Sequence, residues 1–410
     1  MGLTLRAVFL FVMFVCLCTS SLQNFLSGAS PPKNIVLVYT DSRPEVYMTK
    51  EQLLPLVVYF NDVNEALSEF FDGFLFLGIT APSGGSYETG TANDKDWNWL
   101  LDRLLGSGNQ IKNLQDAAEE AKVLLDKEVV LKVIIVIPLP DPNLNLSQRV
   151  AKVKNYIDES TSRFYSFNFT NLRLVGFYWM SETAPERDCQ LIREACNYVH
   201  EKGLKMYWIP YFNAQGYENW KELGFDYVML QPNFAFYDLT TQRFKEVDER
   251  IKRYNLTVEM ELPMYTNNPN LRDWKQSFVI YLNASLFYDW GKLTPKSYYY
   301  GNAFYQIYSS ERPYYNLLYK YVKGTLTFSN ISKEYKEASD YIDGKPTRNL
   351  LLFLGLAVPF MLVMSLIILL LVFRKNESQN LNQEPSFTYF NYLFEKSRLI
   401  QPSSFIFGLF

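Results

Sequence analysis

Histidine is almost missing from this chain: only one, His200, occurs among 410 residues. A site that needs two imidazoles is therefore excluded, and a serine–histidine–aspartate triad is disfavoured. Cysteine is also scarce, and four cysteines cannot frame a disulfide-rich fold. An excess of charge of one sign is lacking too, because the formal net charge is −3 with 20% charged residues. We therefore expect no nucleic-acid partner, no metal site and no cofactor.

Two apolar runs near the ends of the chain do not fit a soluble core. Residues 7–18 follow Arg6 and precede small residues, which is typical of a secretory signal peptide, placed here at 1–29. The alternative for this run is an uncleaved N-terminal anchor. Residues 350–373 contain no charge and are long enough to span a bilayer as one transmembrane helix. Arg374 and Lys375 follow at once, which places that end in the cytoplasm by the positive-inside rule.

These runs predict a single-pass type I protein of the cell membrane. Residues 33–322 would form the extracytoplasmic domain, 323–349 a juxtamembrane stalk and 374–410 a cytoplasmic tail. N-glycosylation sequons on the predicted outer side lie at Asn145, Asn168, Asn255, Asn283 and Asn330.

Between residues 33 and 322, eight short β-branched or aromatic runs alternate with amphipathic stretches. Such alternation is typical of βαβ units around a parallel sheet, and eight units predict an α/β fold closed as a (β/α)8 TIM barrel. The alternative is an open doubly wound sheet, which is disfavoured because no glycine-rich phosphate loop follows any run. We predict helices over 53–70 and from about residue 97. The predicted strands are 35–39, 73–77, 131–137, 172–179, 204–209, 225–230, 257–262 and 297–304.

A further helix is predicted between Pro185 and Gly203. Its two cysteines, Cys189 and Cys196, are two turns apart and beyond disulfide reach, so we interpret both as buried thiols. His200 lies near the C-terminal end of the same helix, where a surface role is expected.

Two glutamates follow predicted strands at the end of the barrel where such folds carry their chemistry. Glu182 follows the fourth strand and Glu261 ends the seventh. Glycoside hydrolysis requires two carboxylic acids, because one protonates the leaving oxygen while the other attacks or activates water. Glu259 shares the strand parity of Glu261 but lies deeper, and which of them is the seventh-strand acid stays open. The alternative roles are structural: a loop salt bridge for Glu182 and a buried ion pair for Glu261.

Other side chains at the same rim suit contacts with a sugar, since carboxylates and amides bind hydroxyl groups and aromatic rings offer flat faces. The long polar loop 83–97 follows the second strand and should form a wall of the site. Asp226 opens the sixth strand at the opposite end, where we interpret it as structural. The expected substrate-binding residues are Asp41, Tyr178, Trp179, Tyr211, Asn213, Gln231, Asn233 and Glu259.

Several short motifs resemble an uncharacterised family called domain of unknown function 4855. They are 39–41 (YTD), 71–76 (FDGFLF), 176–182 (GFYWMSE), 208–212 (WIPYF), 224–226 (GFD) and 231–233 (QPN). The resemblance covers most of residues 33–320. It implies a barrel similar to those of glycosidases, and it brings no established substrate.

Acids on the fourth and seventh strands more loosely resemble the large clan of retaining (β/α)8 glycoside hydrolases. That resemblance implies that Glu182 is the acid/base and Glu261 the nucleophile, so Glu182 should have the higher pKa of the two. The chain departs from the clan where Ser181 replaces the usual asparagine and where Tyr299 and Tyr300 replace a tryptophan.

The sequence therefore predicts a surface-anchored barrel that acts on carbohydrate, most simply as a retaining glycoside hydrolase. The alternative is a non-catalytic glycan-binding or structural protein of the cell envelope.

Overall fold

The computed structural model describes residues 30–334, apart from 44–45, 107–108, 263–272 and 302. The chain divides into two compact units, Met1–Ile342 and Asp343–Phe410, and the described residues all belong to the first. The predicted signal peptide, membrane span and cytoplasmic tail lie outside them. Within 30–334, less the gaps just given, no helix combines the length and the apolar character needed to cross a membrane.

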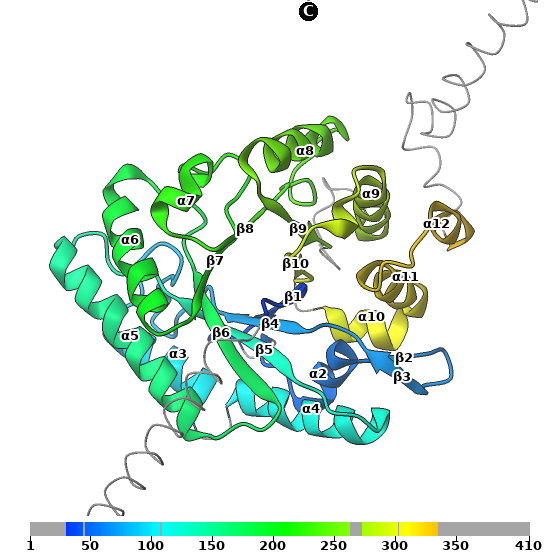
Figure 1. Cartoon of the computed structure of the whole chain (residues 1–410), viewed down its shortest axis with the longest axis horizontal. Coiled ribbons are helices and arrows are strands. Elements are labelled where there is room, and N and C mark those ends of the chain that lie inside the picture. Colours follow the sequence, from blue (N-terminus) through cyan, green and yellow to red (C-terminus); the bar gives the residue numbers. More distant parts are fainter. Residues whose placement is uncertain (1–29, 44–45, 107–108, 263–272, 302, 335–410) are drawn as a thin grey trace, which may run out of the picture. The chain divides into compact units, whose positions relative to one another are not determined.

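Eight parallel strands close into a barrel in chain order, and the last pairs with the first. Figure 1 shows these strands around the centre of the domain with helices outside them. The predicted (β/α)8 fold is confirmed, and each of the eight predicted strands is present. The strands are β1 (Asn34–Tyr39), β4 (Gly73–Leu77), β5 (Leu131–Ile137), β6 (Leu172–Trp179), β7 (Lys205–Trp208), β8 (Tyr227–Leu230), β9 (Thr257–Glu261) and β10 (Lys296–Tyr299).

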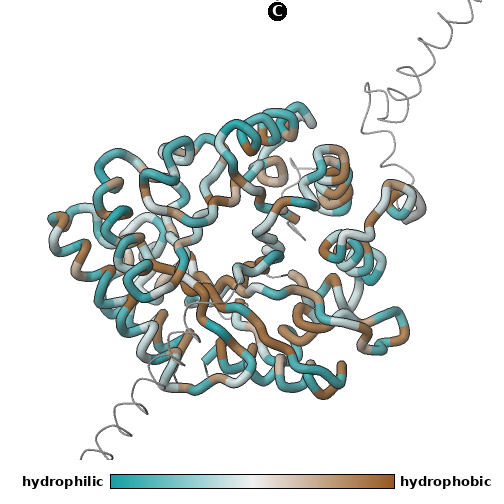
Figure 2. The backbone as a smooth tube through the Cα atoms, viewed as in Figure 1, coloured by the Kyte–Doolittle hydropathy of each residue, from teal (hydrophilic) through white to brown (hydrophobic). Residues whose placement is uncertain are grey.

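Most of the strands can be recognised from sequence because both of their faces are covered, so that their residues are largely apolar. All residues of β5 except Lys132 are buried. Most of the surrounding helices are amphipathic, and Figure 2 shows apolar strands inside a ring of more hydrophilic helices. The helices are α2 (Lys50–Val57), α3 (Asp94–Leu105), α4 (Gln110–Leu125), α5 (Leu146–Ser166), α6 (Glu186–Glu201), α7 (Trp220–Leu223), α8 (Gln242–Tyr254), α9 (Trp274–Phe287), α10 (Phe304–Ser310), α11 (Arg312–Val322) and α12 (Phe328–Glu334).

The predicted helix over 53–70 is correct only as far as Val57 and wrong beyond it. Helix α2 ends at Val57, and the chain continues as an antiparallel hairpin of β2 (Val58–Phe60) and β3 (Ala66–Glu69). β-Branched and aromatic residues favour extended backbone here, and Asn64 supplies the left-handed turn with φ of 60°. The Tyr59 ring also stacks on Tyr319 of α11, with centroids 3.6 Å apart, a contact the local sequence does not reveal. The last strand is shorter than predicted, since β10 ends at Tyr299.

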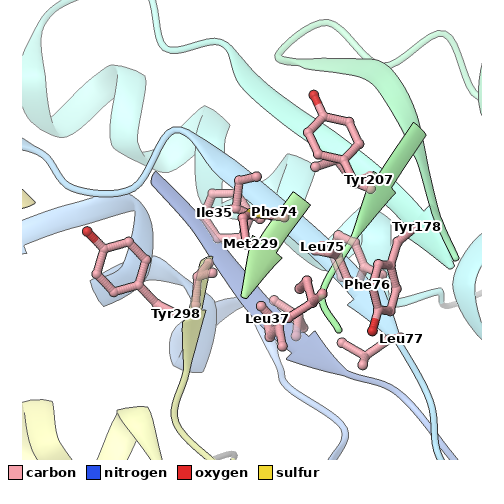
Figure 3. Close-up of a cluster of buried hydrophobic side chains, with 14 of the residues drawn as sticks. Ile35, Leu37, Phe74, Leu75, Phe76, Leu77, Tyr178, Tyr207, Met229 and Tyr298 are labelled. Carbon is pink, nitrogen blue, oxygen red and sulfur yellow. The ribbon is translucent and has the colours of Figure 1, made fainter. Parts of the chain in front are cut away.

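Figure 3 shows how large side chains fill the barrel interior. Tyr178 of β6 and Tyr207 of β7 are register partners, yet their hydroxyl groups point in opposite directions, with that of Tyr178 beside Leu77. Gly176 makes this possible, because a Cβ there would lie 2.7 Å from the Tyr207 ring and 2.1 Å from the carbonyl oxygen of Lys205. Gly176 thus leaves room for the Tyr207 ring, while Tyr178 points to the carboxyl end of the strands, where it lines a cavity.

Helix α6 matches its prediction, with Pro185 as N-cap. Cys196 is buried, Cys189 is only partly buried, and both are free thiols. His200 lies at the helix end, with Nε2 2.7 Å from Oδ2 of Asp226. Asp226 also accepts hydrogen bonds from Nζ of Lys205 and the backbone N–H of Met206, so it joins the strand starts as expected.

The five sequons differ in accessibility. Asn145, Asn168 and Asn255 are exposed, and Asn330 is partly buried. Asn283, in contrast, is only 6% exposed, in the middle of α9. A glycan at Asn283 is disfavoured, because the side chain would have to leave this packing to accept one. The other four sites stay predictions.

Candidate active site

A cavity of about 160 Å³ lies at the carboxyl end of the barrel strands. Leu37 and Leu77 line its apolar part, and Figure 3 shows them beside Tyr178. The volume is below the roughly 300–1,000 Å³ typical of pockets for drug-sized ligands. The cavity therefore suits a small ligand or one unit of a longer one.

Three carboxyl groups from separate parts of the barrel line this cavity. Glu182 follows β6, Glu259 lies within β9, and Glu88 belongs to the loop after β4. Glu259 is only 3% exposed, and its nearest hydrogen-bond partner is the Ser297 hydroxyl of β10 at 3.4 Å. The parallel strands thus bring acids that are 77 residues apart in sequence to one enclosed space.

Glu261 occupies a different place. It is fully buried, and it is not among the residues that line the cavity. Its carboxylate accepts hydrogen bonds from the hydroxyl of Tyr281 on α9, and from the backbone N–H (3.1 Å) and side-chain amide (3.2 Å) of Asn233. Of the two seventh-strand acids that sequence left open, Glu259 is therefore the one that faces the cavity.

A chain of amides connects Glu261 to Glu182. Asn233 donates from Nδ2 to Oε1 of Gln231 at 2.9 Å, and Gln231 is hydrogen-bonded to Glu182. Asn233 holds this position with a left-handed backbone, φ of 55°, and its Oδ1 accepts from the N–H of Phe212. The loops after β7 and β8 thereby fix the amide that touches Glu182.

Burial shifts the titration of all these acids upward. It raises the pKa of Glu182 to about 7, which the hydrogen bond from Gln231 partly offsets and repulsion from Glu88 increases. It raises the pKa of Glu261 to about 8 despite the bonds from Tyr281 and Asn233. Burial, with repulsion from Glu261 and Glu182, also raises the pKa of Glu259 well above its usual range. The pKa of Glu261 is therefore raised as well, and the expected gap, with Glu182 above Glu261, is not observed.

The predicted substrate-binding residues separate into groups. Tyr178, Gln231 and Glu259 line the cavity, whereas Trp179 is fully buried outside it, because alternation along β6 turns it to the opposite side from Tyr178. The prediction that Trp179 binds substrate is therefore wrong, because its side chain packs in the core.

Asp41 and Asn233 are buried and satisfied within the protein. Arg43 binds Asp41 through Nε at 2.9 Å and a terminal nitrogen at 2.7 Å. Burial works against ionisation of Asp41, but these bonds hold its pKa below the usual value. Tyr211 and Asn213 are exposed and do not line the cavity.

Sequence reasoning missed several residues of the cavity wall. Tyr39, Tyr299 and Phe236 meet there, with ring centroids 5.8 Å apart for Tyr39–Tyr299 and 5.4 Å for Phe236–Tyr299. Alternation of side chains along β1 and β10 could have indicated from sequence that Tyr39 and Tyr299 face the barrel interior. Glu88 was also missed as a residue, although the predicted wall 83–97 contains it. The part of the chain that the structure describes holds no group of three or more acids, cysteines or histidines arranged to bind a metal ion.

Residues 34–323 match the family described as "Domain of unknown function (DUF4855)". The chain belongs to this family. The match covers the DUF4855 barrel from its first strand to the end of α11, so the site described above lies within the family domain. Among curated proteins, no relative matches the chain.

Solved structures with a similar arrangement are distant in sequence. A putative alpha-L-fucosidase from Bacteroides thetaiotaomicron is 12% identical, with 70% of this chain and 96% of that chain covered and a TM-score of 0.42. A family 18 chitinase from Crocus vernus is 11% identical, with 75% and 99% covered and a TM-score of 0.36. A mutant tryptophan synthase alpha-subunit from Pyrococcus furiosus is 12% identical, with 72% and 97% covered and a TM-score of 0.36.

Proposed function

We propose that the DUF4855 barrel of this chain is a glycoside hydrolase in which Glu182 is the acid/base and Glu259 the nucleophile. The observation that carries the proposal is that these two carboxyl groups, from β6 and β9, line one small cavity at the carboxyl end of the barrel. This is the end at which barrels of this type carry their chemistry.

In the proposed reaction, Glu182 donates its proton to the glycosidic oxygen as the bond to the anomeric carbon breaks. The Glu259 carboxylate attacks that carbon and forms a glycosyl ester. Glu182, now ionised, then takes a proton from water, which displaces Glu259 and releases the sugar with its anomeric configuration retained. A pKa of about 7 suits Glu182 for both halves of this cycle, because it can lose and regain a proton near neutral pH.

Glu259 supports the nucleophile role better than Glu261 does. A nucleophile must reach the anomeric carbon, and Glu259 lines the cavity whereas Glu261 is enclosed by Tyr281 and Asn233. Burial resists ionisation of Glu259 in the empty site, but positive charge that develops on the sugar ring would stabilise its carboxylate. Glu261 instead holds Asn233, and through it the Gln231 amide that contacts Glu182.

The rest of the cavity wall suits a carbohydrate. The hydroxyl groups of Tyr39 and Tyr178 have no hydrogen-bond partner among the described residues and can serve sugar hydroxyls. Tyr299 and Phe236 add aromatic surface, on which the apolar face of a sugar ring can pack. Gln231 supplies an amide beside Glu182, although position 181 is a serine.

We further propose that the enzyme is secreted through the signal peptide 1–29 and held in the cell membrane by a helix over 350–373. Under this proposal the stalk 323–349 links the two, and the barrel is extracytoplasmic. Glycans are then expected on the exposed asparagines Asn145, Asn168 and Asn255.

A second candidate function is glycan binding without turnover, either as a receptor or as a structural protein of the cell envelope. One observation favours it: the pKa of Glu259 is raised by burial and by two neighbouring acids, which opposes formation of the attacking carboxylate.

The test uses the full-length chain, purified in detergent and incubated with a panel of polysaccharides and aryl glycosides. The proposal expects sugar release by the wild type and its loss in Glu259→Gln. Glu201→Gln, a change at an exposed residue of α6, is the matched control and should behave as wild type. Sugar binding by the wild type without release from any substrate would support the second candidate instead.

A further inference from the structure

The cavity contains one more acid than the proposed reaction uses. Hydrolysis needs two carboxyl groups, and Glu88 is the third. No hydrogen bond or ion pair engages its carboxyl group within the described part of the chain, and burial raises its pKa. Glu88 is nevertheless close enough to Glu182 to raise the pKa of that residue by repulsion.

The backbone that carries Glu88 is firmly held. The neighbouring Tyr87 is fully buried, and its hydroxyl donates to the carbonyl oxygen of Asp96 at 2.8 Å. Tyr87 also accepts from the N–H of Leu139 at 2.8 Å and donates its own N–H to Ile79 at 3.0 Å. The backbone at Glu88 is therefore held in place beside the cavity, and its carboxyl group, which has no partner among the described residues, is available to a ligand.

The cavity wall is acidic without any compensating base. Among the described residues, no lysine, arginine or histidine lines it. Arg43 acts electrostatically on Tyr299, but its guanidinium is paired with Asp41. A sugar that carries a carboxylate, sulfate or phosphate would be repelled by these acids when they are ionised, whereas a cation would relieve the repulsion among them.

The cation that fits is not a metal ion. The three acids are not grouped closely enough for one, since the described residues contain no cluster with that geometry. A cation carried by a sugar is different, because the ring fills the cavity while the ammonium group reaches the wall. Hydrogen bonds from an ammonium to a carboxylate are about twice as strong as neutral ones.

We propose that the substrate of this site is a glycan with unacetylated amino sugars, and that Glu88 binds the ammonium group. The inference rests on the proposed function, because it assumes that Glu182 and Glu259 act on a sugar in this cavity. Glu88 is then a specificity residue, and N-acetylation of the sugar removes the charge that it recognises.

The experiment measures binding of methyl glycosides to the full-length chain in detergent by calorimetry. The ligands are the glycosides of glucosamine and galactosamine, of their N-acetyl forms, and of glucose and galactose. We expect the wild type to bind an ammonium-bearing glycoside roughly 10- to 100-fold more tightly than its N-acetyl or neutral counterpart, as for a buried charged hydrogen bond. Glu88→Gln should remove this preference, and Glu201→Gln should keep it.

Equal or tighter binding of the N-acetyl and neutral glycosides by the wild type would overturn the amino-sugar inference and leave the glycosidase proposal standing. A preference that survives in Glu88→Gln would overturn the role of Glu88. If no glycoside of any class binds and none is hydrolysed, the proposed function itself fails. The comparison among ligands uses only the wild type, so it tests the preference for amino sugars even if the Glu88→Gln chain does not fold.

Discussion

At the scale of single residues, strand alternation decides which rim residues can touch a ligand and which lie behind them. Tyr178 and Trp179 are neighbours in β6, yet only Tyr178 reaches the cavity. Alternation alone does not separate Glu259 from Glu261, which have the same parity. What separates them is Tyr281, which lies on α9, 20 residues after Glu261, and binds its carboxylate. A partner from the following helix is not visible in the strand pattern.

The acid/base role predicts a dependence on the leaving group for Glu182→Gln. On glycosides with poor leaving groups, activity should fall by roughly 10³-fold, because the departing oxygen is no longer protonated. On dinitrophenyl glycosides the loss should be much smaller, since that group departs without a proton. Steady-state rates on the two substrate types measure this, with Glu201→Gln as control. Equal losses on both types would contradict the role.

Glu261→Gln should behave as a change in a positioning residue. Because the Glu261 carboxylate raises the pKa of Glu259 by repulsion, its replacement by a neutral amide should lower the pKa of Glu259. The limb of the pH–rate profile that reports Glu259 ionisation should therefore move to lower pH, while activity near its optimum falls less than about tenfold. Complete loss of activity at every pH would instead identify Glu261 as the nucleophile.

At the scale of elements, the sequence predicts the eight barrel strands well because most are short apolar runs bounded by polar turns, although β10, with Lys296 and Ser297, is not. It predicts the hairpin β2–β3 wrongly because contacts with α11, distant in sequence, add to the extended preference of residues 58–60. Tyr59 stacks on Tyr319, and its hydroxyl donates to Asn316 at 2.9 Å. The sequence finds the two strands that carry the acids, but not the cavity residue Glu88, because loop residues have no periodicity to place them.

The close pairing of β6 with β7 predicts that Gly176→Ala strongly destabilises the folded chain. The added Cβ would lie 2.1 Å from the Lys205 carbonyl oxygen, which belongs to the backbone and cannot rotate away. We expect a loss of about 3 kcal/mol in the free energy of unfolding, measured by thermal or denaturant unfolding. Gly291→Ala is the matched control, since its nearest atom would be a Tyr321 ring carbon at 3.8 Å. Similar stability of the two variants would show that β6 and β7 are less closely packed.

At the scale of the whole molecule, the buried acids couple folding to pH. In the folded chain the pKa values of Glu182 and Glu261 are about 7 and 8, above the roughly 4.3 of an unfolded glutamate. Between these pKa values the folded state binds more protons than the unfolded state. The contribution of these two glutamates to the free energy of unfolding is therefore greatest below about pH 4 and falls as the pH rises to 8. Burial of Glu182 and Glu261 thus lowers the free energy of unfolding under alkaline conditions.

The melting temperature of the full-length chain in detergent should therefore be roughly 5 °C lower at pH 8.5 than at pH 5.5. Glu261→Gln should reduce this difference, because a neutral amide has no proton to lose. Differential scanning fluorimetry across the pH range provides the measurement. A melting temperature that rises toward pH 8.5 would show that these carboxyl groups are ionised in the folded protein.

The most direct test of the central claim is covalent trapping of the nucleophile. The full-length chain is incubated with a panel of 5-fluoro glycosyl fluorides, which form glycosyl esters that hydrolyse slowly, and the digested protein is mapped by mass spectrometry with fragmentation that separates Glu259 from Glu261. We expect a sugar ester on Glu259 of the wild type and no sugar at residue 259 of the Glu259→Gln variant. An ester on Glu261 or Glu182, or turnover of these reagents without any ester, would contradict it.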